Sequence, residues 1–266
     1  MKLVSVILVV ALWALGAQAA PPQASRLDRV LTTQLLRVCI WPDYYGITYR
    51  NPKTQQLTGI DIDLAQALAG DLGAQVRVHF IDSSFAKVID DVLGDRCDIA
   101  MFAIGITASR AEKLRFSRPY LKSDIYAIAT KSNRRVKEWR DIDQPGVVVA
   151  VHKGTYHEQV MREKLRNATL LVADTPFARE QEVESGRADV FMTDFPYSQR
   201  MLINADWARL LVPPSPYHLT SYAYAVAPGD ERWHARVDNF VRDIKRDGRL
   251  AAAAQRHKLD SIVSPD

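Results

Sequence analysis

One stretch decides how this sequence folds: Ile104-Gly105-Ile106-Thr107-Ala108-Ser109-Arg110-Ala111. The apolar run that leads into it, from Asp98 to Ile104, predicts a buried strand. The glycine after that run ends the strand, and Thr107 or Ser109 can cap the short helix that follows. Arg110 is thereby placed near the carboxyl end of a strand, which is where ligands bind in α/β sheets. Its planar guanidinium matches a carboxylate through two hydrogen bonds.

Together with Phe116-Ser117-Arg118-Pro119-Tyr120, this stretch resembles a motif of the periplasmic solute-binding proteins, family 3. The resemblance is to the amino-acid-binding branch of that family, which supplies ABC importers. The motif reads G-x-T-x-T-x-x-R-x-x-x-x-x-F-S-x-P-Y, and Thr107 and Arg110 are in register with it. The sequence departs from it twice. Ala103 stands where Gly is usual, and Gly105 stands where Thr or Ser is usual. Gly105 can still offer a backbone N–H, but a hydroxyl contact is lost.

The resemblance covers nearly the whole chain and implies an α/β fold of the two-lobed, type II periplasmic binding protein class. Each lobe would be a mixed, mostly parallel sheet flanked by helices, and two hinge crossings would join the lobes. We expect lobe 1 to comprise residues 20–123 and 223–266, and lobe 2 to comprise residues 124–222. The ligand would lie in the cleft between them. We expect a monomer that needs no cofactor and no metal.

The first 19 residues have the pattern of a secretory signal peptide. Lys2 precedes the apolar run Leu3–Leu15, and Ala17-Gln18-Ala19 forms a small-residue cleavage site. The run is shorter than the ~20 residues that a membrane span needs. The mature protein is therefore expected to be soluble in the periplasm. The formal net charge of the 266-residue chain is +4, without a basic run interleaved with aromatic residues, which argues against nucleic acid as a partner.

The resemblance assigns the two ends of a zwitterion to opposite lobes. Asp194 directly follows an apolar run, and it corresponds to the acid that receives the ligand's α-ammonium in the relatives. A fresh helix N-terminus presents N–H groups to a carboxylate, and Thr155 and Tyr156 are the contacts expected there. Arg110 would hold the same carboxylate from lobe 1. We expect the guanidinium and the carboxylate of Asp194 to face one common gap between the lobes.

Further positions complete the predicted ligand-binding set. Tyr45 corresponds to an aromatic residue that lies against the ligand, and Phe85 to one that stacks on the ligand's side chain, although a core residue at a helix start fits Phe85 equally well. His152 matches a position whose side chain varies with the substrate, although a lone histidine is more often structural. Gly105 and Thr107 belong to the same set.

Two aspartates and two cysteines are interpreted as structural. Asp61, in the family string G-I-D-I-D-L, is a natural N-cap for the helix that follows, and Asp63 suits the positive end of its dipole. An exported protein meets oxidising conditions, so Cys39 and Cys97 can form a disulfide, and the resemblance makes their strands neighbours. Two buried free thiols are the alternative. Two distant cysteines are too few ligands for a metal site.

These observations predict a non-enzymatic carrier that binds a small amino acid and delivers it to the membrane subunits of an ABC importer. One alternative is an enzyme, because cyclohexadienyl dehydratases share the fold and much of the pattern. They need a positioned acid, whereas Asp194 is followed by Phe195-Pro196-Tyr197. The nearest other acids are expected on a solvated helix face: Glu180, Glu182 and Glu184.

A second alternative is a partner protein of a periplasmic, methanol-type quinoprotein dehydrogenase. Such proteins also pair an R-V-C strand with a C-D strand, as Cys39 and Cys97 would. The presence of both Arg110 and Asp194 argues against this alternative, because a docking protein needs no clamp for a zwitterion.

Overall fold

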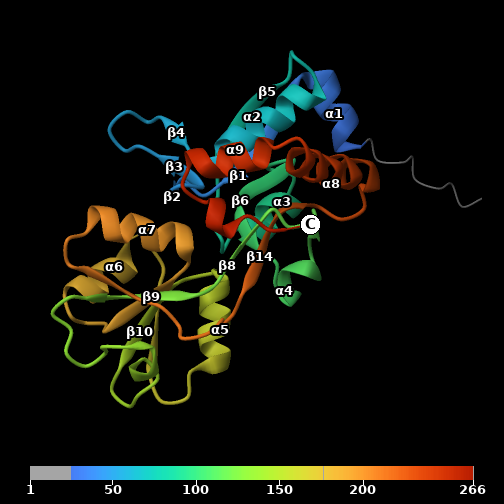
Figure 1. The fold of residues 1–266 in the computed structure, drawn as a ribbon. Coiled ribbons are helices and arrows are strands. Elements are labelled where there is room, and N and C mark those ends of the chain that lie inside the picture. The colour runs from blue at the N-terminus through green and yellow to red at the C-terminus, as the bar shows by residue number, and fades with distance from the viewer. Residues whose placement is uncertain (1–24, 176, 266) are drawn as a thin grey trace, which may run out of the picture.

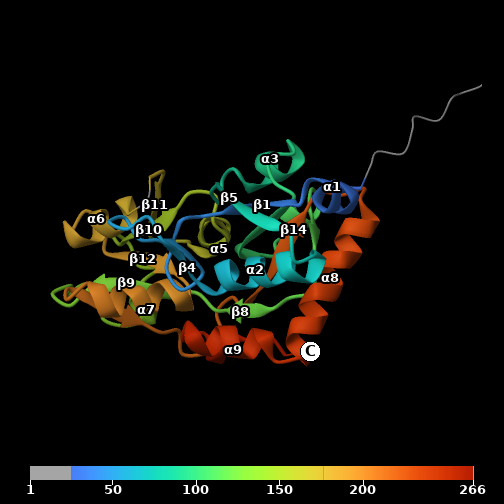
Figure 2. The ribbon, with the colours of Figure 1, turned by 90° about the horizontal axis from the view of Figure 1, so that it is seen from above.

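The computed structural model describes residues 25–175 and 177–265. The signal peptide expected at residues 1–19 lies outside the described residues. The described chain forms two α/β lobes, one on a six-stranded sheet (lobe 1) and one on a five-stranded sheet (lobe 2) (Figure 1). Figure 2 shows the lobes side by side, with α6 and α7 in lobe 2 and α1, α2 and α8 in lobe 1. In the part of the chain so described, no helix is long and apolar enough to cross a membrane.

The sheet of lobe 1 has the strand order β5-β1-β6-β14-β7, and β8 also pairs with β14. The strands β5, β1 and β6 are parallel, whereas β14 runs antiparallel to β6. Every residue of β6 is buried, as expected for a central strand covered on both faces. The bounds are β1 Leu35–Ile40, β5 Arg77–Asp82, β6 Ile99–Gly105, β7 Arg115–Phe116, β8 Leu121–Ser123 and β14 Thr220–Val226.

Helices cover this sheet, and α2 packs against β5, β6, α8 and α9. A separate three-stranded sheet, β2-β3-β4, follows β1 in the chain. The helices are α1 Arg26–Thr33, α2 Ile60–Leu72, α3 Val88–Leu93, α4 Ala108–Ala111, α8 Glu231–Arg246, α9 Arg249–Arg256 and the 3-10 helix η2 Asp260–Ile262. The small strands are β2 Asp43–Tyr44, β3 Thr48–Arg50 and β4 Leu57–Thr58.

Lobe 2 repeats the arrangement on a smaller scale, in the order β11-β10-β12-β9-β13. Here β10 is parallel to β11 and β12, and β9 is antiparallel to β12 and β13. The strands are β9 Tyr126–Thr130, β10 Val148–His152, β11 Thr169–Ala173, β12 Val190–Thr193 and β13 Ala208–Leu211. The helices are α5 Tyr156–Lys164, α6 Ala178–Glu184, α7 Phe195–Asn204 and the 3-10 helix η1 Trp139–Asp141.

The chain passes between the lobes twice, and the two passages are tied together. It leaves lobe 1 after β8 and returns to it at the start of β14, ahead of the boundary expected at 222/223. The carboxylate of Asp124, on the first passage, accepts backbone hydrogen bonds from Tyr217 (2.8 Å) and His218 (2.7 Å) on the second. A pair of adjacent, cross-linked segments is a suitable hinge.

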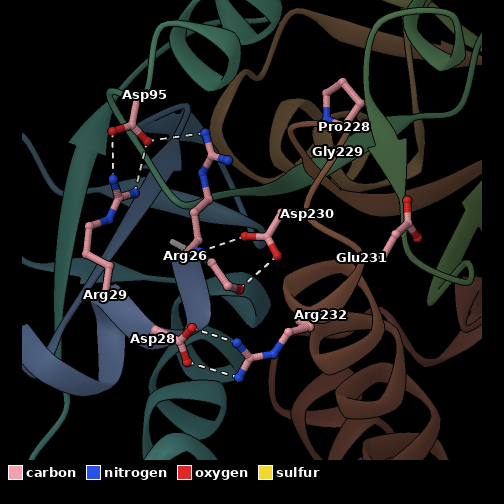
Figure 3. A pocket seen from close by; sticks show the side chains of 10 residues that line it. Arg26, Asp28, Arg29, Asp95, Pro228, Gly229, Asp230, Glu231 and Arg232 are labelled. Atoms are coloured by element: carbon pink, nitrogen blue, oxygen red, sulfur yellow. Dashed lines mark hydrogen bonds and ion pairs between the residues drawn. The ribbon is translucent and has the colours of Figure 1, made fainter. Parts of the chain in front are cut away.

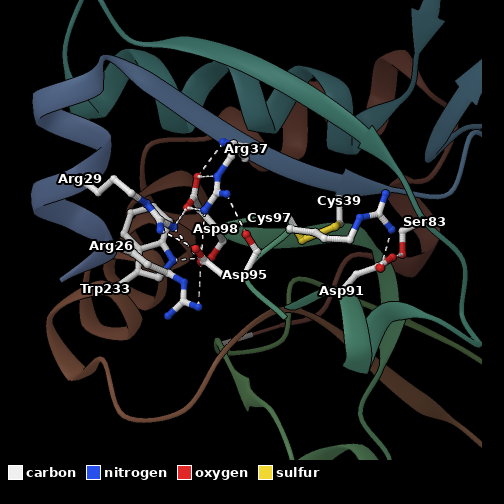
Figure 4. The surroundings of a disulfide bond; sticks show 11 residues. Arg26, Arg29, Arg37, Cys39, Ser83, Asp91, Asp95, Cys97, Asp98 and Trp233 are labelled. Atoms are coloured by element: carbon white, nitrogen blue, oxygen red, sulfur yellow. Dashed lines mark hydrogen bonds and ion pairs between the residues drawn. A yellow bond between two sulfur atoms is a disulfide. The ribbon is translucent and has the colours of Figure 1, made fainter. Parts of the chain in front are cut away.

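The disulfide between Cys39 and Cys97 is confirmed, with the two Cα atoms 5.6 Å apart. It joins β1 to the residues just ahead of β6, and both cysteines are buried (Figure 4). Closing a loop of this length stabilises the folded chain by about 4 kcal/mol in the chain-entropy treatment. Beside it, Asp98 accepts hydrogen bonds from the guanidinium groups of Arg29 and Arg37.

Charged residues attach α1 to lobe 1 around a surface cavity of about 490 Å³, which is lined by residues of α1, by Asp95 and by the start of α8 (Figure 3). Asp230 accepts hydrogen bonds from the Ser25 hydroxyl (2.8 Å) and the Arg26 backbone N–H (2.6 Å). Arg232 forms an ion pair with Asp28. Because these charges are paired with one another, we interpret this cavity as structural.

Asp61 has the structural role expected of it, but not as an N-cap. Gly59 holds the N-cap position of α2, and the buried carboxylate of Asp61 points into the lobe instead. It accepts hydrogen bonds from the Ala103 backbone N–H (2.9 Å) and from the hydroxyls of Tyr120 (2.6 Å) and Tyr224 (3.0 Å). Burial raises the pKa of Asp61 to about 7, an effect that exceeds the lowering by these three hydrogen bonds.

Candidate functional site

The candidate site is the seam where the two lobes touch. From lobe 1 come the loop after β1, the segment ahead of α3 and the end of β6 with α4. From lobe 2 come the first turn of α5, the start of α6 and the junction of β12 with α7. Within the described residues, a cavity of about 400 Å³ and a much smaller one of about 10 Å³ lie along this seam. Phe85, Thr155 and Tyr156 line both cavities.

Arg110 lines the larger cavity and joins the lobes. Its guanidinium donates one hydrogen bond to the carbonyl of Gly105 in lobe 1 (2.9 Å) and another to the carbonyl of Gly154 in lobe 2 (2.8 Å). Thr107 caps α4 by accepting a hydrogen bond from the Arg110 backbone N–H (3.3 Å). This bond fixes the position of the Arg110 backbone. Burial lowers the pKa of Arg110 to about 10, so its side chain remains a cation at neutral pH.

Asp194 lines the smaller cavity and is only 1% exposed. It is the N-cap of α7, where one carboxylate oxygen accepts the Tyr197 backbone N–H (3.2 Å). The other oxygen accepts hydrogen bonds from the hydroxyl of Tyr222 (2.7 Å) and from that of Tyr44. Burial raises the pKa of Asp194, although both tyrosines act in the opposite direction.

The expectation that Arg110 and Asp194 face one common gap is wrong for this conformation. Among the described residues, each lines its own cavity, and the side chains shared by both cavities lie between them. The cavity beside Asp194 has room for about one water molecule. The physical reason is aromatic packing: Trp41 contacts both Tyr44 (5.4 Å between ring centroids) and Phe85 (5.2 Å).

The other predicted contacts of lobe 2 are at the seam. Thr155 caps α5 and donates its hydroxyl to the carbonyl of His152 (2.7 Å). The hydroxyl of Tyr156 lies 3.1 Å from that of Tyr222. His152 is buried and stacks on Trp41, with ring centroids 5.4 Å apart. Burial lowers the pKa of His152 to about 4, so its ring is neutral.

The predicted site residues of lobe 1 lie in different surroundings from one another. Phe85 lies at the seam, and the Arg110 guanidinium carbon is 5.7 Å from its ring centre. Gly105 is packed so closely that a side chain there would meet the ring of Tyr156 at 3.2 Å. Tyr45 packs on Tyr49 and lines a further cavity of about 180 Å³ together with Pro196 of lobe 2, so its contact with a ligand stays a prediction. Its neighbour Tyr44, the last residue of β2, is buried and lines the small cavity.

Sequence reasoning missed an ion pair under the seam. Arg179 and Glu180, at the start of α6, are buried and joined by a 2.9 Å hydrogen bond. The solvated face expected for Glu180 is therefore wrong. The Arg179 guanidinium lines the small cavity and lies over the ring of Tyr197, 4.4 Å from its centre. The usable signal was the spacing of Arg179 and Val183, which puts them on one helix face.

His157 is a second residue that the sequence did not single out. Its ring lies 4.0 Å from that of Tyr156 and lines the small cavity. Burial drives the pKa of His157 well below its ordinary value, so the ring is neutral. Within residues 25–175 and 177–265, no group of three or more His, Cys, Asp or Glu side chains is placed to hold a metal ion.

Comparison with known proteins places this geometry in a family context. Residues 36–259 match the bacterial extracellular solute-binding proteins, family 3. Cyclohexadienyl dehydratase of Pseudomonas aeruginosa is 33% identical over 237 residues, which covers 89% of this chain and 87% of that protein. The ABC transporter glutamine-binding protein GlnH of Bacillus subtilis is 23% identical and covers 94% of this chain and 92% of its own.

Among solved structures, a crystal structure of an ancestral amino acid-binding protein, described as a precursor of cyclohexadienyl dehydratase, matches with a TM-score of 0.79. It is 31% identical in sequence, and the match covers 87% of this chain and 99% of that one. The expected two-lobed, type II architecture is thereby confirmed.

Proposed function

The chain belongs to the bacterial extracellular solute-binding proteins, family 3, and on this basis we propose that it binds a small amino acid or related zwitterion between its lobes and delivers it to an ABC importer. The similarity to a glutamine-binding protein of an ABC transporter supports the delivery step. Export to the periplasm, cleavage after residue 19 and action as a monomer are parts of the same proposal. N-terminal sequencing of the protein released by osmotic shock tests the export step.

One observation carries the proposal: a buried cation and a buried anion reach the same seam from opposite lobes. Arg110 donates to two backbone carbonyls, and a ligand carboxylate offers the same acceptor chemistry in better geometry. Asp194 accepts from two phenol hydroxyls, and a ligand ammonium offers the same donors with a positive charge. Thr155 and the first turn of α5 add N–H donors on the carboxylate side.

The walls of the seam indicate the kind of solute. Trp41, Tyr44, Phe85 and Tyr197 give it an aromatic lining, which suits an apolar or aromatic ligand side chain. The cavity beside Asp194 is far smaller than any amino acid. Binding therefore requires the lobes or these rings to move apart, and closure around the solute is favoured because only the closed form makes both sets of contacts.

The test begins with mass spectrometry of what co-purifies with the protein, followed by calorimetry with that compound. Arg110→Ala removes one partner of a buried charge pair, which costs about 2–5 kcal/mol. The affinity should fall by about 30-fold to several thousand-fold. Arg187→Ala, at an exposed arginine bound to Glu182, is the matched control and should bind as the unaltered protein does. Equal affinity of the Arg110 variant would contradict the proposal.

A cyclohexadienyl dehydratase-like enzyme is the second candidate, favoured by the 33% identical relative and by the buried carboxylate of Glu180. A general acid needs a pKa near the working pH. Burial alone would raise the pKa of Glu180, but Arg179 and Tyr197 together hold it below its ordinary value. The carboxylate is thus kept ionised, which argues against the role of proton donor. Turnover of prephenate or arogenate by the purified protein would replace the carrier assignment.

The disulfide supports testing one further candidate function, that of a partner protein of a quinoprotein dehydrogenase. A pull-down from periplasm distinguishes it from the carrier. Capture of a dehydrogenase, together with no thermal shift from any amino acid, would favour the partner role.

A further inference from the structure

The two lobes are joined by hydrogen bonds between protein groups at the places where a solute would bind. Tyr44, in β2 of lobe 1, donates to Asp194 of lobe 2. Tyr222, in β14 of lobe 1, donates to the same carboxylate oxygen (2.7 Å). On the other side of the seam, Arg110 of lobe 1 donates to the carbonyl of Gly154 in lobe 2 (2.8 Å).

The two bonds to Asp194 lie in a dry environment. Tyr44 is 4% exposed and Tyr222 is fully buried. A hydrogen bond out of contact with water is electrostatically stronger than one in water, and leaving a buried carboxylate without its donors is costly. Separation of the lobes must therefore either bring water to Asp194 or leave the carboxylate unsatisfied.

The two lobes are also closely packed against each other along the seam. Gly154, at φ +76°, approaches lobe 1 so tightly that a side chain on it would come within 2.5 Å of the backbone of Ala86. Trp41 reaches from lobe 1 and stacks on two rings of lobe 2, His152 and Tyr197, at 5.4 and 6.5 Å between centroids. Both contacts require the lobes to be at their present separation.

We propose that Tyr44, together with Tyr222, is an internal latch: it holds the lobes closed through Asp194, and an entering solute competes with Tyr44 for that carboxylate. The latch follows from the contacts within the protein, and the competition rests on the proposed function. An ammonium group has three N–H donors and can replace both phenol hydroxyls. A neutral solute cannot, so Tyr44 also helps to select cationic amino groups.

The latch is tested without any solute, by measuring the distance between spin labels on the two lobes. Lys53→Cys in lobe 1 and Glu184→Cys in lobe 2 are exposed attachment sites, and the native cysteines are bonded to each other. The unaltered background should give one main, short distance. Tyr44→Phe, and more so Tyr44→Phe with Tyr222→Phe, should add a population at longer distance.

Tyr224→Phe is the matched control, because it removes the same hydroxyl from a buried tyrosine of β14 whose carboxylate partner, Asp61, lies within lobe 1. It should leave the distance distribution unchanged. An unchanged distribution in the Tyr44 variants, or a mainly open unaltered protein, would overturn the latch. If a zwitterion co-purifies, Tyr44→Phe should bind it several-fold more tightly. If none binds any variant, the proposed function fails, while the distances still decide the latch.

Discussion

Asp61 and Asp194 have almost the same immediate surroundings. Each is a buried carboxylate that accepts two tyrosine hydroxyls and one backbone N–H. In each case burial raises the pKa of the carboxyl group. They differ in where the donors come from. All the donors of Asp61 belong to lobe 1, whereas Asp194 belongs to lobe 2 and receives both hydroxyls from lobe 1.

This difference shows that the same chemistry serves two purposes. Inside one lobe the donors keep fixed positions relative to one another, so the cluster of Asp61 is a fixed bracket between α2 and β6. Across the hinge the donors move with the opposite lobe, so Asp194 can exchange them. Tyr222 and Tyr224 are two residues apart on β14, and one serves each cluster. A single strand, β14, therefore contributes a donor both to the fixed cluster of Asp61 and to the exchangeable cluster of Asp194.

The largest expected effect separates the two carboxylates by stability. Asp61→Ala leaves three buried donors without an acceptor, at about 1–3 kcal/mol each, and should lower the free energy of unfolding by about 3–9 kcal/mol. Asp194→Ala should cost less, because water can reach its partners when the lobes part. Urea unfolding of both variants measures the difference. Equal losses would remove the distinction between bracket and exchangeable site.

The next effect is on pH dependence. The folded-state pKa of Asp61, about 7, exceeds its unfolded value of about 4, so between these values the folded protein binds the proton more tightly. This contribution is fully present at the acid end and is lost as pH rises towards 7. Stability should fall by about 2–3 kcal/mol from pH 5 to pH 8 on this account.

Asp61→Asn is the control for this pH profile. Its carboxamide cannot titrate, so the variant should lose that part of the slope in urea unfolding at pH 5 and pH 8. A slope as steep as that of the unaltered protein would show that Asp61 does not titrate in this range.

The smallest effect compares single hydroxyls. Tyr224→Phe removes one donor from the fixed cluster and should lower the unfolding free energy by about 1–2 kcal/mol. Tyr44→Phe should cost about 1 kcal/mol or less, because the opened lobe lets water take over the hydrogen bond. Thermal unfolding monitored by calorimetry measures both. A greater loss from Tyr44→Phe would mean that the interlobe contact is as rigid as the core.

Local features of the site followed well from the sequence. The strand, the cap at Thr107 and the position of Arg110 depend on residues next to one another in the chain. The same is true of Thr155 and Asp194, which begin α5 and α7 as N-caps. Glu180 was misplaced because burial of one face of a short helix depends on what packs against it.

The sequence by itself determined the family and the two-lobed α/β fold, because these follow from short patterns of apolar, glycine and capping residues. Only the tertiary structure decided which group each charge binds. Tyr44 and Asp194 are 150 residues apart in the chain, and a hydrogen bond between them depends on how two separately folded lobes come together. No local pattern encodes that distance, so the partners of Arg110 and Asp194 had to be read from the folded molecule.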